Sequence, residues 1–277
     1  MASRRRITVI YGVVLLVVAL AAGLTIRAVW TTTQSHLAYD HCTLGTYELD
    51  TSQTAVAASM VAAVSSYQPV LPERAAVLAL AAGLQESKLR NLPPGAGDRD
   101  SVGVLQQRPS QGWGGGDVAN LQNVFKATTE FLAHLVKING WQTLPLAEAI
   151  QDVQISADGS AYAQHETEAT ALADALIGRT PAGVNCTFGK PTQVAAVAQV
   201  AAKVDGELPI NAPTTAPGTI TVPGAGWQTA AWFVAYADQL GIDAVDYRGK
   251  QWTRAKGWQD RPAAGASAVV ATMAAVG

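Results

Sequence analysis

The chain starts with one long apolar run, residues 7–26, directly after three arginines, Arg4–Arg6. Its twenty uncharged residues match the length of helix that crosses the core of a bilayer. Because basic flanks favour the cytoplasmic side, residues 1–30 are predicted to be a cytoplasmic tail and a single-pass transmembrane anchor. The alternative is a cleaved secretory signal, with Ala19–Leu20–Ala21 as its cleavage site. In both cases the residues after about 30 lie on the extracytoplasmic side of the cell membrane.

Helical spacing of apolar residues dominates the region from residue 42 to residue 186. It predicts helices at about 51–67, 72–89, 121–138, 146–155 and 162–177. A glycine-rich polar stretch, 91–113, interrupts this spacing and is expected to be irregular, with room for a short β-hairpin. Residues 31–190 are therefore predicted to form a mainly α domain that contains one short irregular or β-hairpin segment.

The pattern of residues changes after one more predicted helix, at about 192–204. Residues 207–226 hold four prolines and a single charge, so 191–226 is predicted to be a helix followed by a Pro-rich linker. A helix near 230–240 and two short alternating runs then predict a small α+β module over residues 227–277. Four tryptophans in this module are expected to form its core, because so small a module otherwise lacks one.

Composition and charge exclude several classes of protein. The chain is 49% apolar and only 14% charged, whereas about a quarter of residues are charged in an average protein. The first thirty residues hold four arginines and no acid, so the rest carries 15 basic against 21 acidic residues, a net charge of −6. No basic surface for nucleic acid is expected. With one long apolar run only, a channel or multi-pass transporter is excluded as well.

Cys42 and Cys186 are the two cysteines of the sequence. An exported chain places them in an oxidising compartment, so they are predicted to form a disulfide; two buried thiols are the alternative. A bond that closes a loop of about 140 residues stabilises the fold by about 4–5 kcal/mol if chain entropy dominates. The four histidines are scattered and lack the spacing of metal ligands, so neither a metal nor a cofactor is expected.

The candidate chemistry lies at the end of the predicted helix 72–89. Glu86 continues an apolar helix face, whose other members follow in steps of three and four: Ala75, Leu78, Ala79 and Ala82. A carboxyl group that points inward resists ionisation, so its pKa rises toward the range in which it donates a proton near neutral pH. Cleavage of a glycosidic bond needs such an acid, and Ser87 is placed to orient it. A solvated carboxylate at a helix end is the alternative.

Amide side chains follow Glu86 in the sequence. Gly103 leads a short apolar segment that ends in Gln106 and Gln107. An amide both donates and accepts hydrogen bonds, which suits the acetamido and hydroxyl groups of an amino sugar.

Together these residues resemble a known family. Glu86–Ser87 followed by Gly103–Val104–Leu105–Gln106 is similar to the Glu-Ser and Gly-Leu-Met-Gln motifs of lytic transglycosylases in the lysozyme-like superfamily. A group of exported actinobacterial proteins of that superfamily is more similar still, through three stretches: Gln85–Leu92, Gly97–Gly103 and Leu105–Gly114. The resemblance spans about residues 42–186. The last module resembles a C-terminal domain of several exported actinobacterial cell-wall proteins, through Trp232–Ala235 and Tyr247–Thr253.

The resemblance implies a lysozyme-like domain and a role for each matching residue. Glu86 would be the catalytic acid/base, Ser87 its supporter, and Gly103, Gln106 and Gln107 a lining of the sugar groove. The bond cut would be the β-1,4 link between N-acetylmuramic acid and N-acetylglucosamine in peptidoglycan. The muramic C6 hydroxyl would close on the anomeric carbon and leave a 1,6-anhydro sugar.

One departure from the family leaves alternatives open. The Ala-Tyr-Asn motif of such enzymes, whose Tyr reaches the catalytic Glu, is absent from residues 149–156; Tyr162 or Gln154 is the candidate replacement.

Hydrolysis by water instead needs a second carboxylate, for which Asp98 and Asp100 are candidates, although a local salt-bridged turn is the more favoured interpretation of this pair. Trp113 and Trp141 are candidate platforms for sugar rings, with burial as the alternative.

Three classes of function remain after the sequence analysis. The leading one is an enzyme that cuts peptidoglycan glycan strands, as a lytic transglycosylase or as a lysozyme-type hydrolase. The second is a catalytically weak wall-binding protein that keeps the groove without the Tyr. The third is an interaction protein of an envelope machine for secretion or DNA transfer, with the C-terminal module as its docking part. Expected partners are glycan strands, the cell membrane through residues 7–26, and such envelope proteins.

Overall fold

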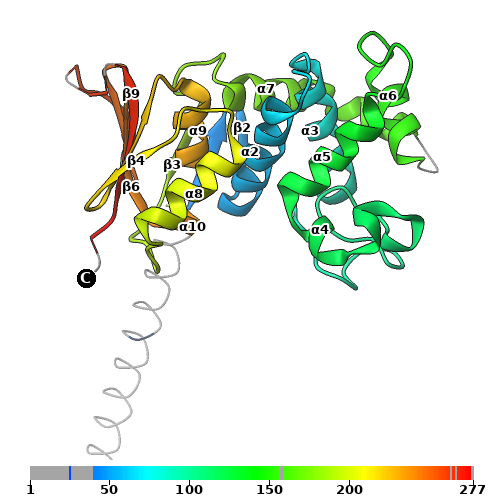
Figure 1. Ribbon diagram of the computed structural model, residues 1–277, viewed down its shortest axis with the longest axis horizontal. Helices are drawn as coiled ribbons and strands as arrows, with labels where there is room; N and C mark the ends of the chain where they lie inside the picture. The colour runs from blue at the N-terminus through cyan, green and yellow to red at the C-terminus, as the bar shows by residue number, and fades with distance from the viewer. Residues whose placement is uncertain (1–24, 26–39, 156–158, 263, 266, 276–277) are drawn as a thin grey trace, which may run out of the picture. The chain divides into compact units, whose positions relative to one another are not determined.

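The computed structural model describes Thr25, residues 40–155, 159–262, 264–265 and 267–275 (Figure 1). The described residues from His41 onward form one compact unit. The predicted transmembrane segment, residues 7–26, lies outside the described residues apart from Thr25. Among the helices of the described part, none combines the length and apolar character that a membrane crossing requires.

Six α-helices and three 3₁₀ turns build the helical body, within the described ranges. The α-helices are α2 (Thr51–Ser66), α3 (Arg74–Ser87), α4 (Val118–Gln122), α5 (Val124–Leu135), α6 (Leu146–Gln154) and α7 (Glu166–Ile177). The 3₁₀ turns are η1 (Pro109–Gln111), η2 (Trp113–Gly116) and η3 (Gly159–His165). The helix predicted at 121–138 is two helices, because the side chain of Asn123 caps α5 by accepting from the backbone N–H of Lys126.

α2 is the central helix of this body (Figure 1). It begins with a capping box, in which the Asp50 side chain accepts from the Gln53 backbone and the Gln53 side chain accepts from the Asp50 backbone. Ten consecutive or near-consecutive positions of α2 are buried, from Thr54 to Val64, and most of them are small. A helix that is apolar on nearly all sides belongs in a core, and its small side chains let α3, α5 and α9 (Trp227–Ala235) approach closely.

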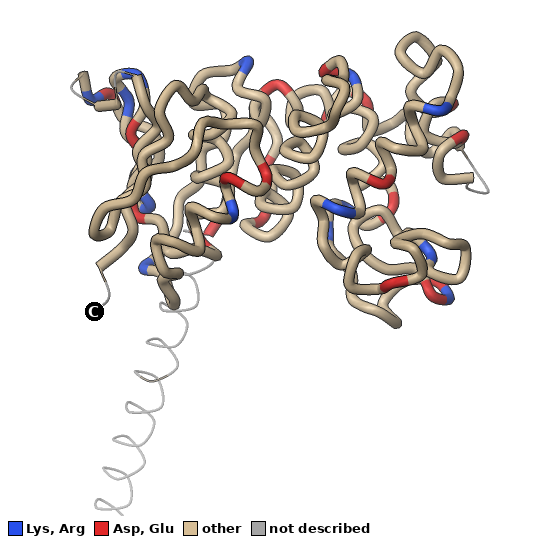
Figure 2. Tube along the Cα trace, viewed as in Figure 1, with Lys and Arg blue, Asp and Glu red and all other residues tan. Residues whose placement is uncertain are grey.

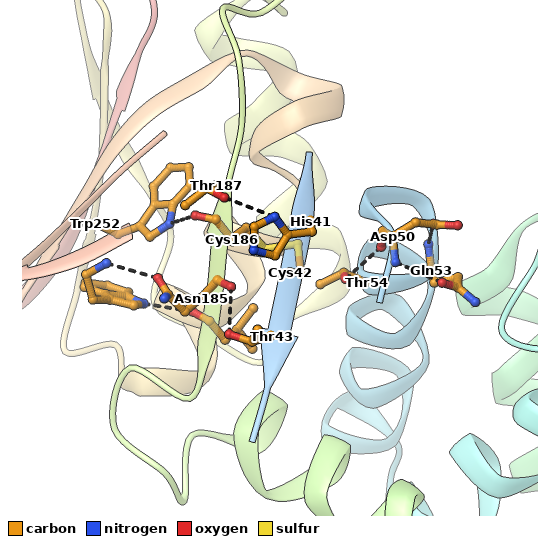
Figure 3. Close-up of a disulfide and its surroundings, with 12 residues drawn as sticks. His41, Cys42, Thr43, Asp50, Gln53, Thr54, Asn185, Cys186, Thr187 and Trp252 are labelled. Atoms are coloured by element: carbon orange, nitrogen blue, oxygen red, sulfur yellow. Dashed lines mark hydrogen bonds between the residues drawn. A yellow bond between two sulfur atoms is a disulfide. The ribbon is translucent and has the colours of Figure 1, made fainter. Parts of the chain in front are cut away.

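A three-stranded antiparallel sheet joins the two ends of the helical region. It has the order β2 (Tyr47–Leu49), β1 (His41–Leu44), β3 (Val184–Thr187). Cys42 and Cys186 are register partners in β1 and β3, and their sulfur atoms form the predicted disulfide, which is confirmed (Figure 3). Both cysteines are completely buried. The disulfide therefore fastens residues 144 apart in sequence inside the core.

A six-stranded antiparallel sheet follows, and it is larger than the predicted C-terminal module. Its order is β4 (Thr214–Ala216), β5 (Thr219–Pro223), β9 (Ala268–Met273), β6 (Ile242–Tyr247), β7 (Lys250–Thr253), β8 (Gly257–Asp260). Helices α8 (Val197–Glu207) and α10 (Ala237–Leu240) complete this part. The segment 191–226, expected to end in a linker, thus contains α8, β4 and β5. Pro223 closes β5, a position at a strand end where proline costs no ladder hydrogen bond.

The predicted mainly α fold is wrong. The described residues form two antiparallel sheets, of three and six strands, beside the helices, so the architecture is α+β. The two alternating runs expected after residue 241 are β6 and β7. The other strands were missed because they are short, and β5 pairs with β9, which lies far along the chain. Residues 91–113 hold no hairpin of regular strands either, but two isolated bridges, Leu92 with Gly103 and Val102 with Gln107.

α9 connects the helical body to the six-stranded sheet. It contacts α2 and α7 on one side and β6 on the other (Figure 1). The approach is close at Gly178, the left-handed residue after α7, where an added Cβ would lie 2.5 Å from the backbone nitrogen of Gln228. Trp232 and Trp252 are buried, and the Trp252 indole donates to the Cys186 carbonyl at 2.8 Å (Figure 3). These tryptophans are core residues, and they tie the two parts together.

Loss of the disulfide should destabilise the whole compact unit. Replacing both cysteines by alanine (C42A/C186A) releases a loop of 144 residues in the unfolded chain, so the free energy of unfolding should fall by about 4–5 kcal/mol. Chemical denaturation of the oxidised protein and the double variant measures the difference. Wild-type protein treated with a reductant should match the variant; a change below about 1 kcal/mol would show that the bond constrains little.

Candidate functional site

Glu86 lies in the last turn of α3. The helix ends there because Lys88 and Leu89 adopt left-handed backbone conformations, with φ of 56° and 57°. The Glu86 side chain is half-buried, and its Oε1 accepts a hydrogen bond from the Tyr162 hydroxyl at 2.5 Å. Glu86 therefore does not extend freely into solvent.

The surroundings of Glu86 change its acidity. Burial raises its pKa above the ordinary value, while hydrogen bonds from Tyr162 and Gln154 act in the opposite direction and lower it. Burial outweighs them, so the net shift of the pKa is upward. A carboxyl group in this state keeps a proton to higher pH than one in water, yet two neutral donors stabilise the carboxylate after the proton leaves.

Tyr162 reaches Glu86 from η3, a segment that follows α6 and precedes α7. The Tyr162 side chain is only 1% exposed. Next to it, Gln164 Nε2 and His165 Nε2 both contact Gln85 Oε1, at 3.2 and 3.0 Å. An amide oxygen is an acceptor only, so His165 donates from Nε2. These two contacts hold η3 against the end of α3 and thereby fix the tyrosine hydroxyl beside the carboxyl group.

Ser87 connects the helix end to the segment that follows it. Its hydroxyl is buried, donates to the Val104 carbonyl at 2.8 Å and accepts from the Arg90 backbone at 3.1 Å. The serine thus positions the turn at Gly103–Gln106 beside α3, and the structure gives it no contact with the Glu86 carboxyl. Gln154 adds a second connection, because its Nε2 donates to the Leu105 carbonyl at 2.9 Å.

The three predicted groove residues differ in where they point. Gly103 has a φ of 79°, and a Cβ there would lie 2.5 Å from the Leu121 carbonyl oxygen, so only glycine fits this turn. Gln106 is half-buried and folds back, donating to the Gly103 carbonyl at 2.8 Å. Gln107 is 2% exposed and donates to the Ala127 carbonyl at 3.2 Å. Its carboxamide faces the protein interior, not a groove.

The two candidate second carboxylates are held in the polar loop. Asp100 accepts from Arg108 Nε at 2.7 Å and from the Ser110 backbone at 2.8 Å. Hydrogen bonds with the Ser110 side chain, the Ser110 backbone and Arg108 lower the pKa of Asp100 far below the ordinary value. The Asp98 side chain is 88% exposed and lies 3.7 Å from Arg99. The structure brings neither into contact with Glu86. Both have the geometry of a salt-bridged turn that shapes the loop.

A cavity of about 290 Å³ lies on the other side of Gln154, whose side chain hydrogen-bonds to Glu86; Glu86 itself does not line it. Trp113 and Gln154 both line it, together with Gln111, Gly112, His134, Val153 and Ile155. The Trp113 ring stacks on His134, with ring centroids 4.4 Å apart, and it is only partly buried. Such a ring is a suitable platform for one face of a sugar. Trp141, by contrast, is 3% exposed and belongs to the core.

The sequence did not indicate the residues that hold Tyr162 and Trp113 in place through tertiary contacts. Gln85 stands directly before Glu86, and His165 is one of the four scattered histidines, whose spacing indicates no role in the sequence. His134 lies beneath Trp113 although 21 positions separate them, and no local signal could have indicated this stacking. Over the described ranges, no cluster of three or more His, Cys, Asp or Glu side chains could hold a metal ion.

Comparison with protein-family models and with curated proteins finds no match for this chain. The resemblance to lytic transglycosylases therefore rests on the motif residues themselves.

The raised pKa of Glu86 makes folding stability depend on pH. The folded state binds the Glu86 proton more tightly than the unfolded state, so this stabilisation is complete below the ordinary pKa and is lost as pH rises through the folded pKa. Relative to wild type, Glu86→Gln should therefore become more stable as pH rises from about 4 to 8. The free energy of unfolding of Glu86→Gln relative to wild type should rise by about 1.4 kcal/mol for each tenfold by which folding strengthens proton binding at Glu86. Denaturation across that range measures it.

Asp98→Asn is the matched control, because it also removes one carboxylate but from an 88% exposed side chain. A stability difference between Glu86→Gln and wild type that is the same at every pH would show that the fold does not perturb Glu86.

Removing the tyrosine hydroxyl should raise the Glu86 pKa further. Tyr162→Phe deletes the hydrogen bond that stabilises the carboxylate. Gln85→Leu should act in the same direction but less, because it removes the acceptor that holds η3 and leaves the hydroxyl present. Carbon-13 NMR titration of the Glu86 carboxyl measures both shifts. A downward shift in either variant would contradict this arrangement.

Proposed function

We propose that this protein cleaves the glycan strands of peptidoglycan by the lytic transglycosylase reaction. The observation that carries the proposal is the half-buried Glu86 carboxyl group, with a raised pKa and a 2.5 Å hydrogen bond from Tyr162. A single carboxyl group that keeps its proton to higher pH is what this reaction requires of an enzyme, and the cavity lined by Trp113 and Gln154 lies on the other side of Gln154.

In the proposed reaction, protonated Glu86 donates its proton to the oxygen between N-acetylmuramic acid and N-acetylglucosamine. The bond from the anomeric carbon to that oxygen breaks, and the muramic C6 hydroxyl forms a new bond to the same carbon. The Glu86 carboxylate takes the proton that the C6 hydroxyl loses, which restores the acid. No water is consumed, and the products are a free N-acetylglucosamine hydroxyl and a 1,6-anhydromuramic end.

Tyr162 supports turnover over binding alone. The carboxylate that forms after proton donation sits in a partly buried place, and a hydrogen bond from the phenol lowers the free energy of that charged state. A wall-binding protein without activity would need no such donor at Glu86. Gln154 gives a second donor from the end of α6, where the family has its tyrosine.

The two aspartates favour transglycosylation over hydrolysis. A retaining hydrolase has two carboxyl groups about 5–5.5 Å apart, and an inverting one about 6.5–9.5 Å apart. Asp100 is fixed by Arg108 and Ser110, and Asp98 extends into solvent, so neither is arranged as a partner of Glu86. The reaction that needs one carboxylate fits this site better.

The disulfide supports a location outside the cytoplasm for this activity. A buried bond between Cys42 and Cys186 forms and persists in an oxidising compartment, which is where peptidoglycan lies. We therefore place the compact unit on the extracytoplasmic side.

Digestion of purified sacculi tests the proposed function. The full chain should release anhydromuropeptides, identified by mass spectrometry, and Glu86→Gln should lower the rate by about a hundredfold or more while sedimentation with sacculi is retained. Glu148→Gln, an exposed position on α6, controls for the loss of one carboxylate and should keep the wild-type rate. Release of reducing ends would assign a hydrolase instead, and undiminished release by Glu86→Gln would refute the assignment of the acid.

A further inference from the structure

The cavity lined by Trp113 and Gln154, called the Trp113 cavity below, has an almost uncharged lining. The charged positions of the chain are marked in Figure 2, and no Lys, Arg, Asp or Glu of the described residues lines this cavity. His134 is the one titratable residue of its described lining, and that imidazole stacks on the Trp113 ring. A lining without fixed charges offers nothing to offset the desolvation of a charged ligand, so the cavity favours a neutral ligand.

The size and the walls of the Trp113 cavity suit one sugar ring. Its volume of about 290 Å³ is at the lower end of the range for ligand pockets, about 300–1,000 Å³. Trp113 supplies an aromatic surface for the ring. Val153 and Ile155 supply apolar surface beside it, and the Ile155 side chain is 86% exposed. A ligand that carries a methyl group next to polar atoms is therefore accommodated.

Gln154 connects the Trp113 cavity to the acid. The two hydrogens of its Nε2 go to the Leu105 carbonyl, at 2.9 Å, and to the Glu86 carboxyl. The side chain is half-buried, and its Oε1 accepts no hydrogen bond from the described residues and is not sealed from solvent. This oxygen is therefore the atom that Gln154 has left for a ligand in the cavity, and it selects a hydrogen-bond donor.

The acetamido group of N-acetylglucosamine has the required features. Its amide N–H donates to Gln154 Oε1, its methyl group contacts Val153 and Ile155, and its ring lies against Trp113. N-acetylmuramic acid has the same acetamido group but adds a lactyl carboxylate, for which the described lining of the cavity holds no cation. The uncharged sugar is therefore the better match.

We propose that the Trp113 cavity holds an N-acetylglucosamine residue by its acetamido N–H, and that Gln154 is the positioning residue that couples this binding to Glu86. The consequence for cleavage rests on the proposed function; the choice of ligand rests on the cavity alone. When Oε1 accepts a hydrogen bond, the amide is polarised and Nε2 becomes a stronger donor. A stronger donor stabilises the Glu86 carboxylate, so the proton passes more readily to the glycosidic oxygen.

Binding of methyl glycosides to the full-length protein, followed by NMR, tests the ligand without cleavage. Methyl N-acetyl-β-D-glucosaminide should bind with a Kd below about 10 mM. Methyl 2-O-acetyl-β-D-glucoside has an ester of the same shape without the N–H and should bind at least about tenfold more weakly, as should methyl N-acetyl-β-D-muramide. The assignment is overturned if the glucosaminide does not bind, or if either comparator binds equally well.

Carbon-13 NMR titration of the Glu86 carboxyl tests the coupling. Saturation with the glucosaminide should lower the pKa of Glu86, and by reciprocity the glycoside should bind about twofold or more tightly above that pKa than below it. In Gln154→Met the pKa of Glu86 should be higher than in wild type and should not respond to the glycoside. Gln259→Met makes the same change at an exposed position on β8 and should behave as wild type. A pKa that stays constant or rises on saturation of the wild type overturns the coupling.

Trp113→Ala locates the binding. It should weaken the glucosaminide about tenfold and leave the Glu86 pKa of the free protein at the wild-type value, because Trp113 lines the cavity and Glu86 does not. Trp113→Ala thus reduces occupation of the cavity, whereas Gln154→Met removes the connection to the acid. Wild-type affinity in Trp113→Ala places the sugar elsewhere and overturns the assignment to this cavity.

The sacculus assay separates this proposal from the proposed function. If the protein releases anhydromuropeptides but the glucosaminide neither binds nor changes Glu86, the enzyme assignment stands and the role of the Trp113 cavity is wrong. If the glucosaminide binds with the expected N–H and Gln154 dependence but nothing is released, the cavity assignment stands and the enzyme assignment fails.

Discussion

The hydrogen bond between Tyr162 and Glu86 depends on where helices α3 and α6 end and on the path of η3 between α6 and α7. α3 stops at left-handed Lys88, which leaves Glu86 in its last turn. α6 stops at Gln154, and η3 then returns across the end of α3 with Tyr162 in its middle. Gln85 accepts hydrogen bonds from Gln164 and His165 and so holds η3 in place. A carboxyl group with a raised pKa results from this packing and from no residue alone.

The Ser87–Val104 bond has a corresponding role on the other side of α3. It joins the end of α3 to the turn at Gly103. This turn packs against α4, and the contact is so close that no larger residue can replace Gly103. The residues that resemble a family motif thus divide by function in this structure. Glu86 has the carboxyl group with the raised pKa, while Ser87, Gly103 and Gln107 supply buried hydrogen bonds and backbone shape that place the loop.

The C-terminal part is not an appendage to the helical body. The α9 helix packs on α2 and α7, and the indole groups of Trp252 and Trp258 donate to the backbone of β3, beside the disulfide. Arg254, 4% exposed, donates to the carbonyls of Gly189, Ala237 and Ile242 and pairs with Asp238. A buried guanidinium is stable only when its donors are satisfied, and the chain on both sides of α8 contributes the acceptors.

Local signals were enough to predict the helices, because the spacing of apolar residues, the caps and the glycine stops act within a few residues. The disulfide between the two cysteines and the inward helix face that ends in Glu86 were also predicted from the sequence. The pairing of β5 with β9 did not follow from the sequence, because it joins segments far apart in the chain. Tyr162 and Gln154 were the sequence candidates to reach Glu86, and only the structure showed that both of them do. Short strands bury too little surface to reveal themselves locally, and a hydrogen bond between distant side chains has no periodicity. The sequence by itself therefore determined which carboxyl group continues an apolar helix face, and the tertiary structure decided what surrounds it, because the pKa of a carboxyl group depends on burial and partners that only the packed chain supplies.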